Sequence, residues 1–142
     1  MPHAEDVIDA APRAVWDVVT DYTSYPRFFP EFKDAQVIDT EGTAKIVEFT
    51  CDYGKTMNYT LRIDHDEAKL TTRWTYVGGD LKDSKGGWSF QDAGGGKTKV
   101  AYDVDAQVGF FVPKFVVDKL TANNIPKMFE QLKNEVAKRG KK

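Results

Sequence analysis

Four of the six tyrosines in this sequence carry the hydroxyl groups best placed to act on a bound molecule. Tyr53, Tyr59, Tyr76 and Tyr102 fall at alternate positions of segments with a period of two, which places them on one face of a predicted sheet. A buried tyrosine hydroxyl needs a hydrogen-bond partner, and in the wall of a cavity it becomes a polar handle for a ligand. The alternative is that these hydroxyls reach the rim of the sheet and bond to water or to the backbone.

Groups that transfer protons or bind metals are scarce on the same face. Apart from Lys45 at a strand end, alternation points no Asp, Glu, His, Lys or Arg inward, whereas general acid–base catalysis needs a titratable group within hydrogen-bond reach of the substrate. His65 lies in an acidic turn, far in sequence from His3, and is expected at the surface; Cys51 is expected to be an inert buried thiol. The sequence therefore predicts no catalytic residue, no metal site and no cofactor, unless a one-residue slip of register exchanges the two faces.

Length and composition indicate one soluble domain over residues 1–142. Of the 142 residues, 41% are hydrophobic and 30% are charged. The formal net charge of -2 argues against DNA as a partner. One cysteine excludes an internal disulfide, no apolar run approaches the ~20 residues of a membrane span, and the acidic N-terminus does not resemble a signal peptide. We therefore expect a cytoplasmic protein.

Turn signals recur along the middle of the chain and divide it into antiparallel strands. Alternation gives the sheet an apolar inner face, rich in aromatic side chains, and a polar outer face, although Lys45 and Ile46 break the rule. We expect Gly86-Gly87 to form a β-bulge. The expected strands are residues 3–9, Ala35–Thr40, Ala44–Tyr53, Thr56–Asp64, Lys69–Val77, Leu81–Asp92 and Lys97–Val108.

Two short helical segments and one long one complete the pattern. Ala11-Pro12 starts a helix that ends near Asp21-Tyr22, and Tyr25–Phe32 forms a second short helix or turn. The C-terminal stretch Val112–Lys138 has apolar residues at helical spacing, with a break expected near Asn123-Asn124. A sheet with one apolar face packs most simply by curling around such a helix. We predict an α+β fold in which a curved antiparallel sheet of about seven strands wraps around a long C-terminal helix, with two short helices after the first strand.

Three stretches combine aromatic residues, proline and glycine in a recognisable order. They are Ala14–Tyr22, the segment Tyr25-Pro26-Arg27-Phe28-Phe29-Pro30, and Gly87–Phe90 with the later Gly109–Pro113. Together they resemble the START-like helix-grip superfamily (SRPBCC), and the second resembles the Tyr-Pro-x-Phe-x-Pro motif of its coenzyme Q-binding and polyketide cyclase-like branch. The resemblance covers nearly the whole chain. It implies a ligand tunnel between the sheet and the long helix, and it carries over no catalytic residue.

The aromatic inner face with little inward charge predicts binding or transport of a hydrophobic small molecule, such as a lipid, a quinone or a polyketide-like compound. An alternative is a polyketide cyclase or dehydratase that acts by holding its substrate folded, with Tyr59 and Tyr102 as weak acids. The residues expected to bind the ligand are Phe28, Phe29, Phe49, Tyr53, Tyr59, Leu61, Trp74, Tyr76, Trp88, Tyr102, Phe111, Phe115, Leu120 and Met128.

Two further features have more than one interpretation. The lysines of the final helix and tail form either a solvated face or a surface for transient contact with an anionic membrane or a ribosome. A group of aromatic residues forms either core beneath one end of the sheet or a gate at the cavity mouth, with Phe110 and Phe111 as the opposite lip. The residues of this group are Trp16, Phe28, Phe29 and Phe32.

Overall fold

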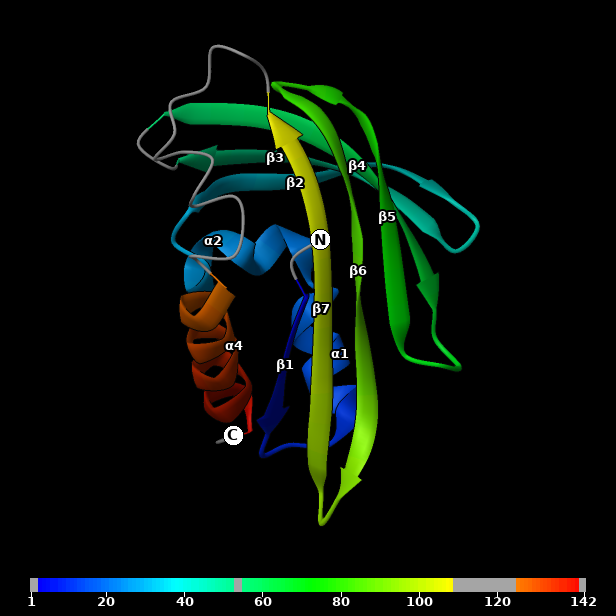
Figure 1. Cartoon of the computed structure of the whole chain (residues 1–142), viewed down its shortest axis with the longest axis vertical. Helices are drawn as coiled ribbons and strands as arrows, with labels where there is room; N and C mark the ends of the chain where they lie inside the picture. The colour runs from blue at the N-terminus through cyan, green and yellow to red at the C-terminus, as the bar shows by residue number, and fades with distance from the viewer. Residues whose placement is uncertain (1–2, 53–54, 109–124, 141–142) are drawn as a thin grey trace.

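A computed structural model describes residues 3–52, 55–108 and 125–140, which form an α+β fold on one seven-stranded antiparallel sheet (Figure 1). The strand order is β1-β7-β6-β5-β4-β3-β2, so the first strand pairs with the last and all other neighbours are consecutive in the chain. The elements are β1 (His3–Ile8), α1 (Pro12–Val19), the 3₁₀ turn η1 (Tyr22–Ser24), α2 (Tyr25–Phe28), β2 (Phe32–Glu41), β3 (Ala44–Asp52), β4 (Thr56–Asp66), β5 (Thr71–Gly79), β6 (Leu81–Gly94), β7 (Lys97–Val108) and α4 (Ile125–Arg139).

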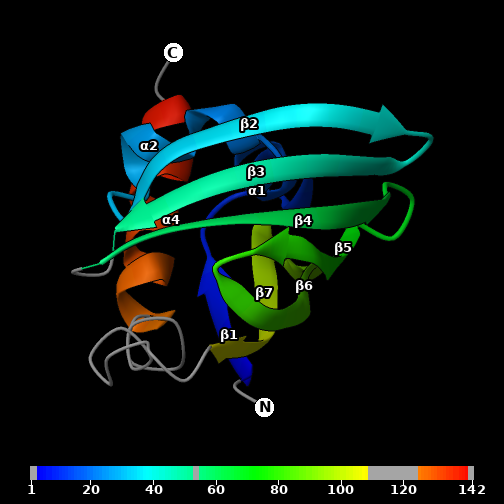
Figure 2. The ribbon, with the colours of Figure 1, turned by 90° about the horizontal axis from the view of Figure 1, so that it is seen from above.

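The sheet is curved, and the helices lie on its concave side. Figures 1 and 2 show that the strand direction turns between β2–β4 and β6–β7, with α2 and α4 inside the bend. Helix α4 contacts α1, α2 and β1. This is the helix-grip arrangement predicted from the sequence, in which a sheet with one apolar face closes around an amphipathic helix.

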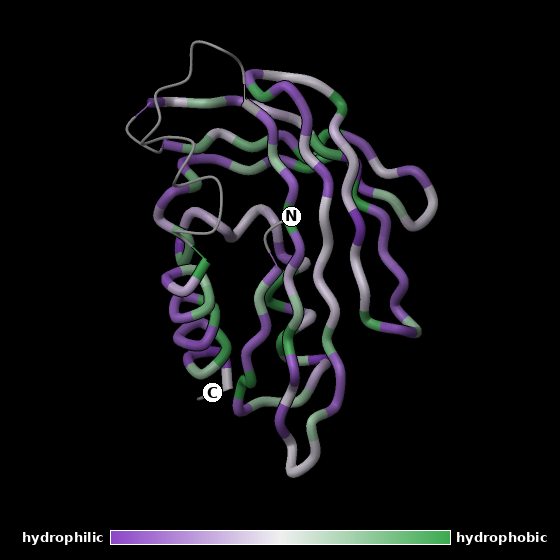
Figure 3. The backbone as a smooth tube through the Cα atoms, viewed as in Figure 1, coloured by the Kyte–Doolittle hydropathy of each residue, from purple (hydrophilic) through white to green (hydrophobic). Residues whose placement is uncertain are grey.

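Alternating side chains give the sheet the two predicted faces. In β4, Met57, Tyr59, Leu61 and Ile63 are buried, and the residues between them are exposed or half-buried. Figure 3 shows hydrophobic and hydrophilic residues succeeding one another along the strands. Because burying one large apolar side chain stabilises a fold by roughly 1.5–3 kcal/mol, a one-residue slip of β4 would expose this whole set, and its register is strongly fixed.

Gly86 and Gly87 lie in a regularly paired part of β6, so the β-bulge predicted there is wrong. Gly86 pairs with Val104 and Gly87 with Asp103, and the register shifts of β6 occur nearer its two ends. A Cβ atom on Gly86 would lie 2.6 Å from the ring atom Cζ2 of Trp74. The absence of a side chain therefore serves the close approach of the Trp74 ring and of the Asp103 carbonyl rather than a change of register.

Four strands extend beyond their predicted ends, one of them β6, which continues to Gly94 instead of Asp92. β2 begins at Phe32 instead of Ala35, β4 continues to Asp66 instead of Asp64, and β5 includes Gly79, which was expected in a turn. Apart from Phe32, the added residues are polar, glycine or alanine and carry little hydrophobic signal, but backbone pairing continues through them. The extension of β4 matters most, because it adds one more inward-facing position to the strand.

Helix α4 presents Ile125, Phe129, Leu132 and Val136 to the core, as the spacing of the C-terminal stretch predicted. The earlier part of the predicted long helix, with its break near Asn123-Asn124, lies outside the described residues. Within the described residues, no helix is long and apolar enough to cross a membrane.

Arg139 fastens the last turn of α4 to the N-terminal helices. Its Nη2 lies 3.0 Å from Oδ2 of Asp21, and its Nε lies 2.8 Å from Oε2 of the buried Glu135. The guanidinium carbon also lies 5.6 Å from the centre of the Phe28 ring. The ion pairs and the ring contact together hold α4 against α2 and the loop after α1.

Candidate functional site

A cavity of about 110 Å³ lies between the inner face of the sheet, the η1–α2 segment and Met128 of α4. One water molecule needs roughly 10–15 Å³ of such space, so the cavity has room for a small organic group. Apolar walls with a few hydroxyls are typical of small-molecule sites. The described residues that line it are Tyr22, Tyr25, Phe29, Phe32, Phe49, Tyr59, Leu61, Ile63, Thr72, Trp74, Leu81, Ser84, Trp88, Tyr102, Val104, Ala106 and Met128.

Aromatic rings in mutual contact form much of the wall. On the β5–β7 side, the Tyr102 ring lies 4.5 Å from Trp88 and 5.9 Å from Trp74, measured between centroids. At the other end, the Tyr25 ring lies 5.0 Å from Phe29 in an edge-to-face contact. Rings that support one another in this way have few alternative rotamers, so they resist collapsing into the cavity.

Tyr102 on β7 offers a polar group in this apolar wall. Within residues 3–52, 55–108 and 125–140, its hydroxyl makes no hydrogen bond. Burial raises the pKa of Tyr102, because an apolar site disfavours the phenolate. The hydroxyl therefore stays protonated at neutral pH and can donate to an oxygen atom of a ligand.

Ser84 and Thr72 add two more hydroxyls to the cavity wall. The Ser84 Oγ accepts from Nε1–H of Trp74 at 3.2 Å, and the Thr72 Oγ1 accepts from the backbone N–H of Trp88 at 3.2 Å. Because an N–H group can only donate, both O–H groups keep their own hydrogen for a further acceptor. The polar groups of this side of the cavity thus match a ligand that carries acceptors such as carbonyl oxygens.

Most of the residues predicted to bind a ligand line the cavity, namely Phe29, Phe49, Tyr59, Leu61, Trp74, Trp88, Tyr102 and Met128. Phe28 is buried beside Arg139 and does not contribute to the lining. Tyr76 is also absent from the lining, because its hydroxyl donates to the Leu81 carbonyl at 2.7 Å and accepts from the Leu81 N–H at 3.1 Å. Tyr76 therefore follows the alternative considered for the inner-face tyrosines, in which the hydroxyl bonds to the backbone. Tyr53, Phe110, Phe111, Phe115 and Leu120 lie outside the described residues.

Other lining residues were not singled out from the sequence. Thr72 and Val104 follow the predicted inward alternation, which could have identified them. Tyr22 and Tyr25 come from the short helical segments, where spacing alone does not give side-chain direction. Ser84 lies in the first, irregular part of β6, where alternation is broken by a register shift.

His65 points to the inner side of the sheet, so the prediction of a surface histidine and of no inward histidine is wrong. It lies two residues after Ile63 in the extended β4, on the same face, and is half-buried. The Trp16 ring lies 6.0 Å from the imidazole in an edge-to-face contact. The Nδ1 atom lies 2.7 Å from the carbonyl oxygen of Thr43, and the Nε2 atom lies 2.8 Å from the hydroxyl of Tyr22. Burial lowers the pKa of His65.

A second hollow, of about 280 Å³, lies at the surface beside His65. Lys45 contributes to its wall, which agrees with the inward direction that strict alternation gives this residue. Trp16, for which core and gate were both considered, is buried and lies beside this hollow rather than at the cavity. The lining residues are Trp16, Thr20, Gly42, Thr43, Lys45, His65 and Glu67.

Ion pairs engage three of the basic side chains of α4. Lys133 lies 2.8 Å from Asp6 and Lys127 lies 4.0 Å from Glu31, while Arg139 is held as described above. These pairs reduce the free positive charge on the described helix, and contact with a membrane or a ribosome stays a prediction. Among the described residues, no group of three or more His, Cys, Asp or Glu side chains is placed to hold a metal ion.

Comparison of the fold with solved structures gives several close matches. TTHA0849 from Thermus thermophilus superposes with a TM-score of 0.85 at 21% identity, covering 97% of both chains. The Zhui aromatase/cyclase from Streptomyces sp. R1128 gives 0.86 at 15% identity, covering 98% of this chain and 94% of the other. A STAR-related lipid transfer protein from Xanthomonas axonopodis gives 0.77 at 13% identity, covering 95% and 84%. At these identities the likeness establishes the START-like helix-grip fold alone.

Sequence comparison assigns the chain to a family. A search of curated proteins gives no significant match. The family model described as polyketide cyclase/dehydrase and lipid transport matches residues 8–133. The comparisons do not confirm the narrower coenzyme Q-binding branch. Because the match spans most of the sequence and agrees with the fold, this chain belongs to the polyketide cyclase/dehydrase and lipid transport family of the START-like superfamily.

Proposed function

We propose that this protein binds an apolar small molecule with a carbonyl or similar acceptor oxygen, in the cavity between the sheet and α4, and carries it in the manner of a lipid- or polyketide-binding protein. The observation that supports this most is the Tyr102 hydroxyl, a protonated donor in an aromatic wall with no hydrogen bond to a described residue. A polar group in such a place is costly unless a partner reaches it, and a ligand oxygen is a suitable partner.

The size of the cavity limits the part of the ligand that enters it. An apolar cavity of about 150 Å³ can hold benzene. The cavity here, at about 110 Å³, is somewhat smaller, so it encloses at most about one ring of a ligand. Such a group gains from contact with Trp74, Trp88 and Phe49, whose faces and edges are preformed.

Acetophenone and ethylbenzene test the proposal as a matched pair, because they differ by a carbonyl in place of a CH₂ group. Both should bind in the cavity, as followed by NMR titration of the wild-type protein. Tyr102→Phe should weaken acetophenone about three- to tenfold and leave ethylbenzene unchanged, since one net hydrogen bond is worth about 0.5–1.5 kcal/mol. Tyr76→Phe is the control and should change neither affinity, because its hydroxyl bonds to the backbone outside the cavity.

Two results would overturn the proposal. The first is the absence of binding by either compound together with no apolar ligand in native mass spectra of protein purified from cells. The second is an equal effect of Tyr102→Phe on acetophenone and ethylbenzene, which would show that the hydroxyl does not contact the carbonyl.

A further inference from the structure

Tyr22 and His65 connect the apolar cavity with the surface hollow beside His65. Tyr22 is a wall residue of the apolar cavity, and His65 is a wall residue of the surface hollow beside α1. The hydrogen bond of 2.8 Å between the Tyr22 hydroxyl and Nε2 of His65 crosses the boundary between them. A proton that leaves the cavity through Tyr22 therefore has an acceptor on the side of the solvent.

The hydrogen-bond pattern fixes the direction of this contact. The Thr43 carbonyl can only accept, so Nδ1 of His65 carries the hydrogen of that 2.7 Å bond. In the neutral ring Nε2 is then the unprotonated nitrogen, and the Tyr22 hydroxyl donates to it. A hydroxyl, a base that accepts its proton and a third group that orients the base form the arrangement that activates a side chain for proton transfer.

The surroundings of His65 favour the neutral ring that a base requires. Burial is the main cause of its lowered pKa, and the charge of Lys45 acts in the same direction. The Thr43 carbonyl and the carboxylates of Asp64 and Glu67 act in the opposite direction and raise it. Burial also raises the pKa of Tyr22, so its phenolate does not form alone, and its proton moves only together with one taken up from a bound molecule.

We propose that Tyr22 and His65 form an acid–base pair that removes and returns a proton at the carbon next to the carbonyl group of a ketone bound in the cavity. Tyr22 is the residue that contacts the substrate, and His65 acts through it. The pair is open to water on one side through the surface hollow, and on the other side it faces a site with carbonyl-binding donors. The inference rests on the proposed function, since the ketone must first bind.

The proposed step conserves both protons and electrons. The C–H bond next to the carbonyl breaks, its proton passes to Oη of Tyr22, and the proton of Tyr22 passes to Nε2 of His65. The electron pair of the C–H bond forms the C=C bond of an enolate, whose charge lies on the carbonyl oxygen near the Tyr102 hydroxyl. In the reverse direction His65 returns a proton through Tyr22 to the carbon. No oxidant, metal or second substrate is needed.

Hydrogen–deuterium exchange into the methyl group of acetophenone tests this step in D₂O. The wild-type protein should accelerate the exchange above the buffer rate, as followed by loss of the methyl proton signal. Tyr22→Phe and His65→Gln should each lower the protein-dependent rate by roughly 10²-fold, the lower end of what a positioned acid–base group contributes. Tyr76→Phe is the control and should keep the wild-type rate.

The pH profile separates a chemical role from a structural one. The protein-dependent rate should fall on acidification as His65 becomes protonated, with an apparent pKa below the ordinary histidine value of 6.5. His65→Gln should remove this dependence, whereas loss of a merely structural contact would lower the rate without changing the profile.

The outcomes separate this inference from the proposed function. Acetophenone that binds but exchanges no faster than in buffer overturns the acid–base pair and leaves ligand binding intact. Absence of acetophenone binding overturns the pair for ketones, while a different apolar ligand found by native mass spectrometry would still support carriage. If Tyr22→Phe does not fold, His65→Gln and the wild-type profile decide the matter.

Discussion

Two histidines on opposite faces of one sheet show how the surroundings set the charge of the same side chain. His3 lies on β1 and is exposed, whereas His65 lies near the end of β4 and is half-buried on the inner side. Both rings have both nitrogens in hydrogen bonds. The difference between them is in the partners and in the access of water.

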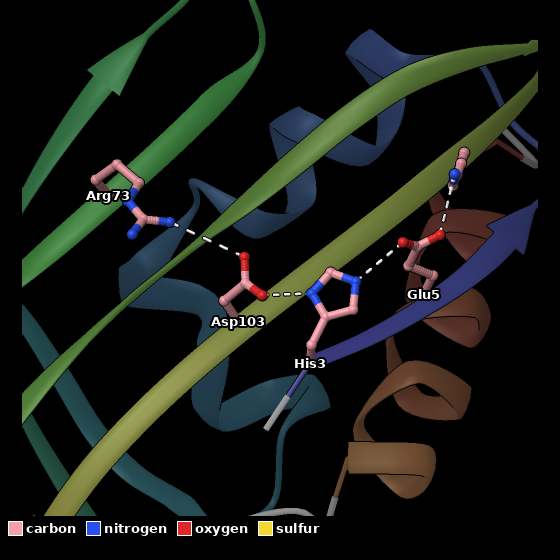
Figure 4. A network of polar contacts seen from close by, with 5 residues as sticks. His3, Glu5, Arg73 and Asp103 are labelled. Carbon is pink, nitrogen blue, oxygen red and sulfur yellow. Dashed lines mark hydrogen bonds and ion pairs between the residues drawn. The ribbon is translucent and has the colours of Figure 1, made fainter. Parts of the chain in front are cut away.

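Carboxylates surround His3. Figure 4 shows the ring between Asp103 of β7 and Glu5 of β1, with Arg73 reaching Asp103 from β5. The hydrogen bonds that the ring donates to Asp103 and then to Glu5 raise the pKa of His3, because both favour the imidazolium. Lys99, 3.0 Å from Glu5, completes an exposed network of alternating charges. Such a network orders the outer face of the sheet, and its screening by water leaves it with little influence on the interior.

His65 has a carbonyl and a phenol in place of the two carboxylates. Neither partner carries a charge, and burial disfavours the imidazolium, so the pKa moves in the opposite direction. The ring therefore keeps an unprotonated nitrogen at neutral pH, directed at Tyr22. Of these two histidines, the one on the inner face is the one equipped to act as a base.

The largest expected difference between the two histidines is in their effect on the free energy of unfolding. His65→Leu keeps apolar volume between Trp16 and Tyr22 but leaves the buried Tyr22 hydroxyl without its acceptor. We expect the free energy of unfolding to fall by about 1–3 kcal/mol, the cost of an unsatisfied buried polar group. His3→Leu should change the urea midpoint much less, since its ring is exposed and its contribution at neutral pH is small. Equal midpoints for the two variants in urea unfolding at neutral pH would contradict the contrast.

A smaller effect is expected on the pH dependence of stability. The folded-state pKa of His65 lies below 6.5, so between these values the unfolded chain binds more protons and the free energy of unfolding rises with pH. Acidification through this window therefore removes stability. For His3 the folded-state pKa lies above 6.5, so its small contribution is present below pH 6.5 and is lost as pH rises through the folded value.

Urea unfolding between about pH 5 and pH 8 measures this pH dependence. His65→Gln should flatten the loss of stability on acidification, and His3→Gln should make it slightly steeper. A His65→Gln curve parallel to that of the wild type would show that His65 has the same pKa in the folded and unfolded states. That result would contradict the lowered pKa of the half-buried ring.

Much of the fold follows from the alternation of side chains. The inner faces of β3, β4 and β7 follow from every second residue, because burial on one side leaves a strong hydrophobic signal. His65 escaped that signal because the strand continues past Ile63 through polar residues that are paired to β5. Extending β4 by one more alternation would have placed its ring inside.

The candidate site is less accessible from sequence than the fold. Gly86 gives no local sign that it makes room for the Trp74 ring, since that contact joins different strands. Tyr22 and Tyr76 are the same type of residue, but the Tyr22 hydroxyl bonds to His65 and the Tyr76 hydroxyl bonds to the Leu81 backbone. The chain direction after η1 and the position of the Leu81 backbone decide which partner each hydroxyl meets. Cavities form where such contacts between distant segments leave space, and the periodicity of a single strand does not contain that information.

The smallest expected effect is on the pKa values of the two histidines, which two substitutions should bring closer together. Asp103→Asn removes the charged acceptor that contributes most to the raised pKa of His3, so this pKa should fall toward 6.5. Lys45→Met removes a positive charge beside His65, so the lowered pKa of His65 should rise slightly, with burial still holding it below 6.5. NMR titration of the imidazole protons measures both values, and each substitution should leave the other histidine unchanged because the outer and inner faces are separated by the sheet. A shift of His65 in Asp103→Asn would mean that charge on the outer network reaches the site, and the separation of the two faces on which the acid–base pair depends would fail.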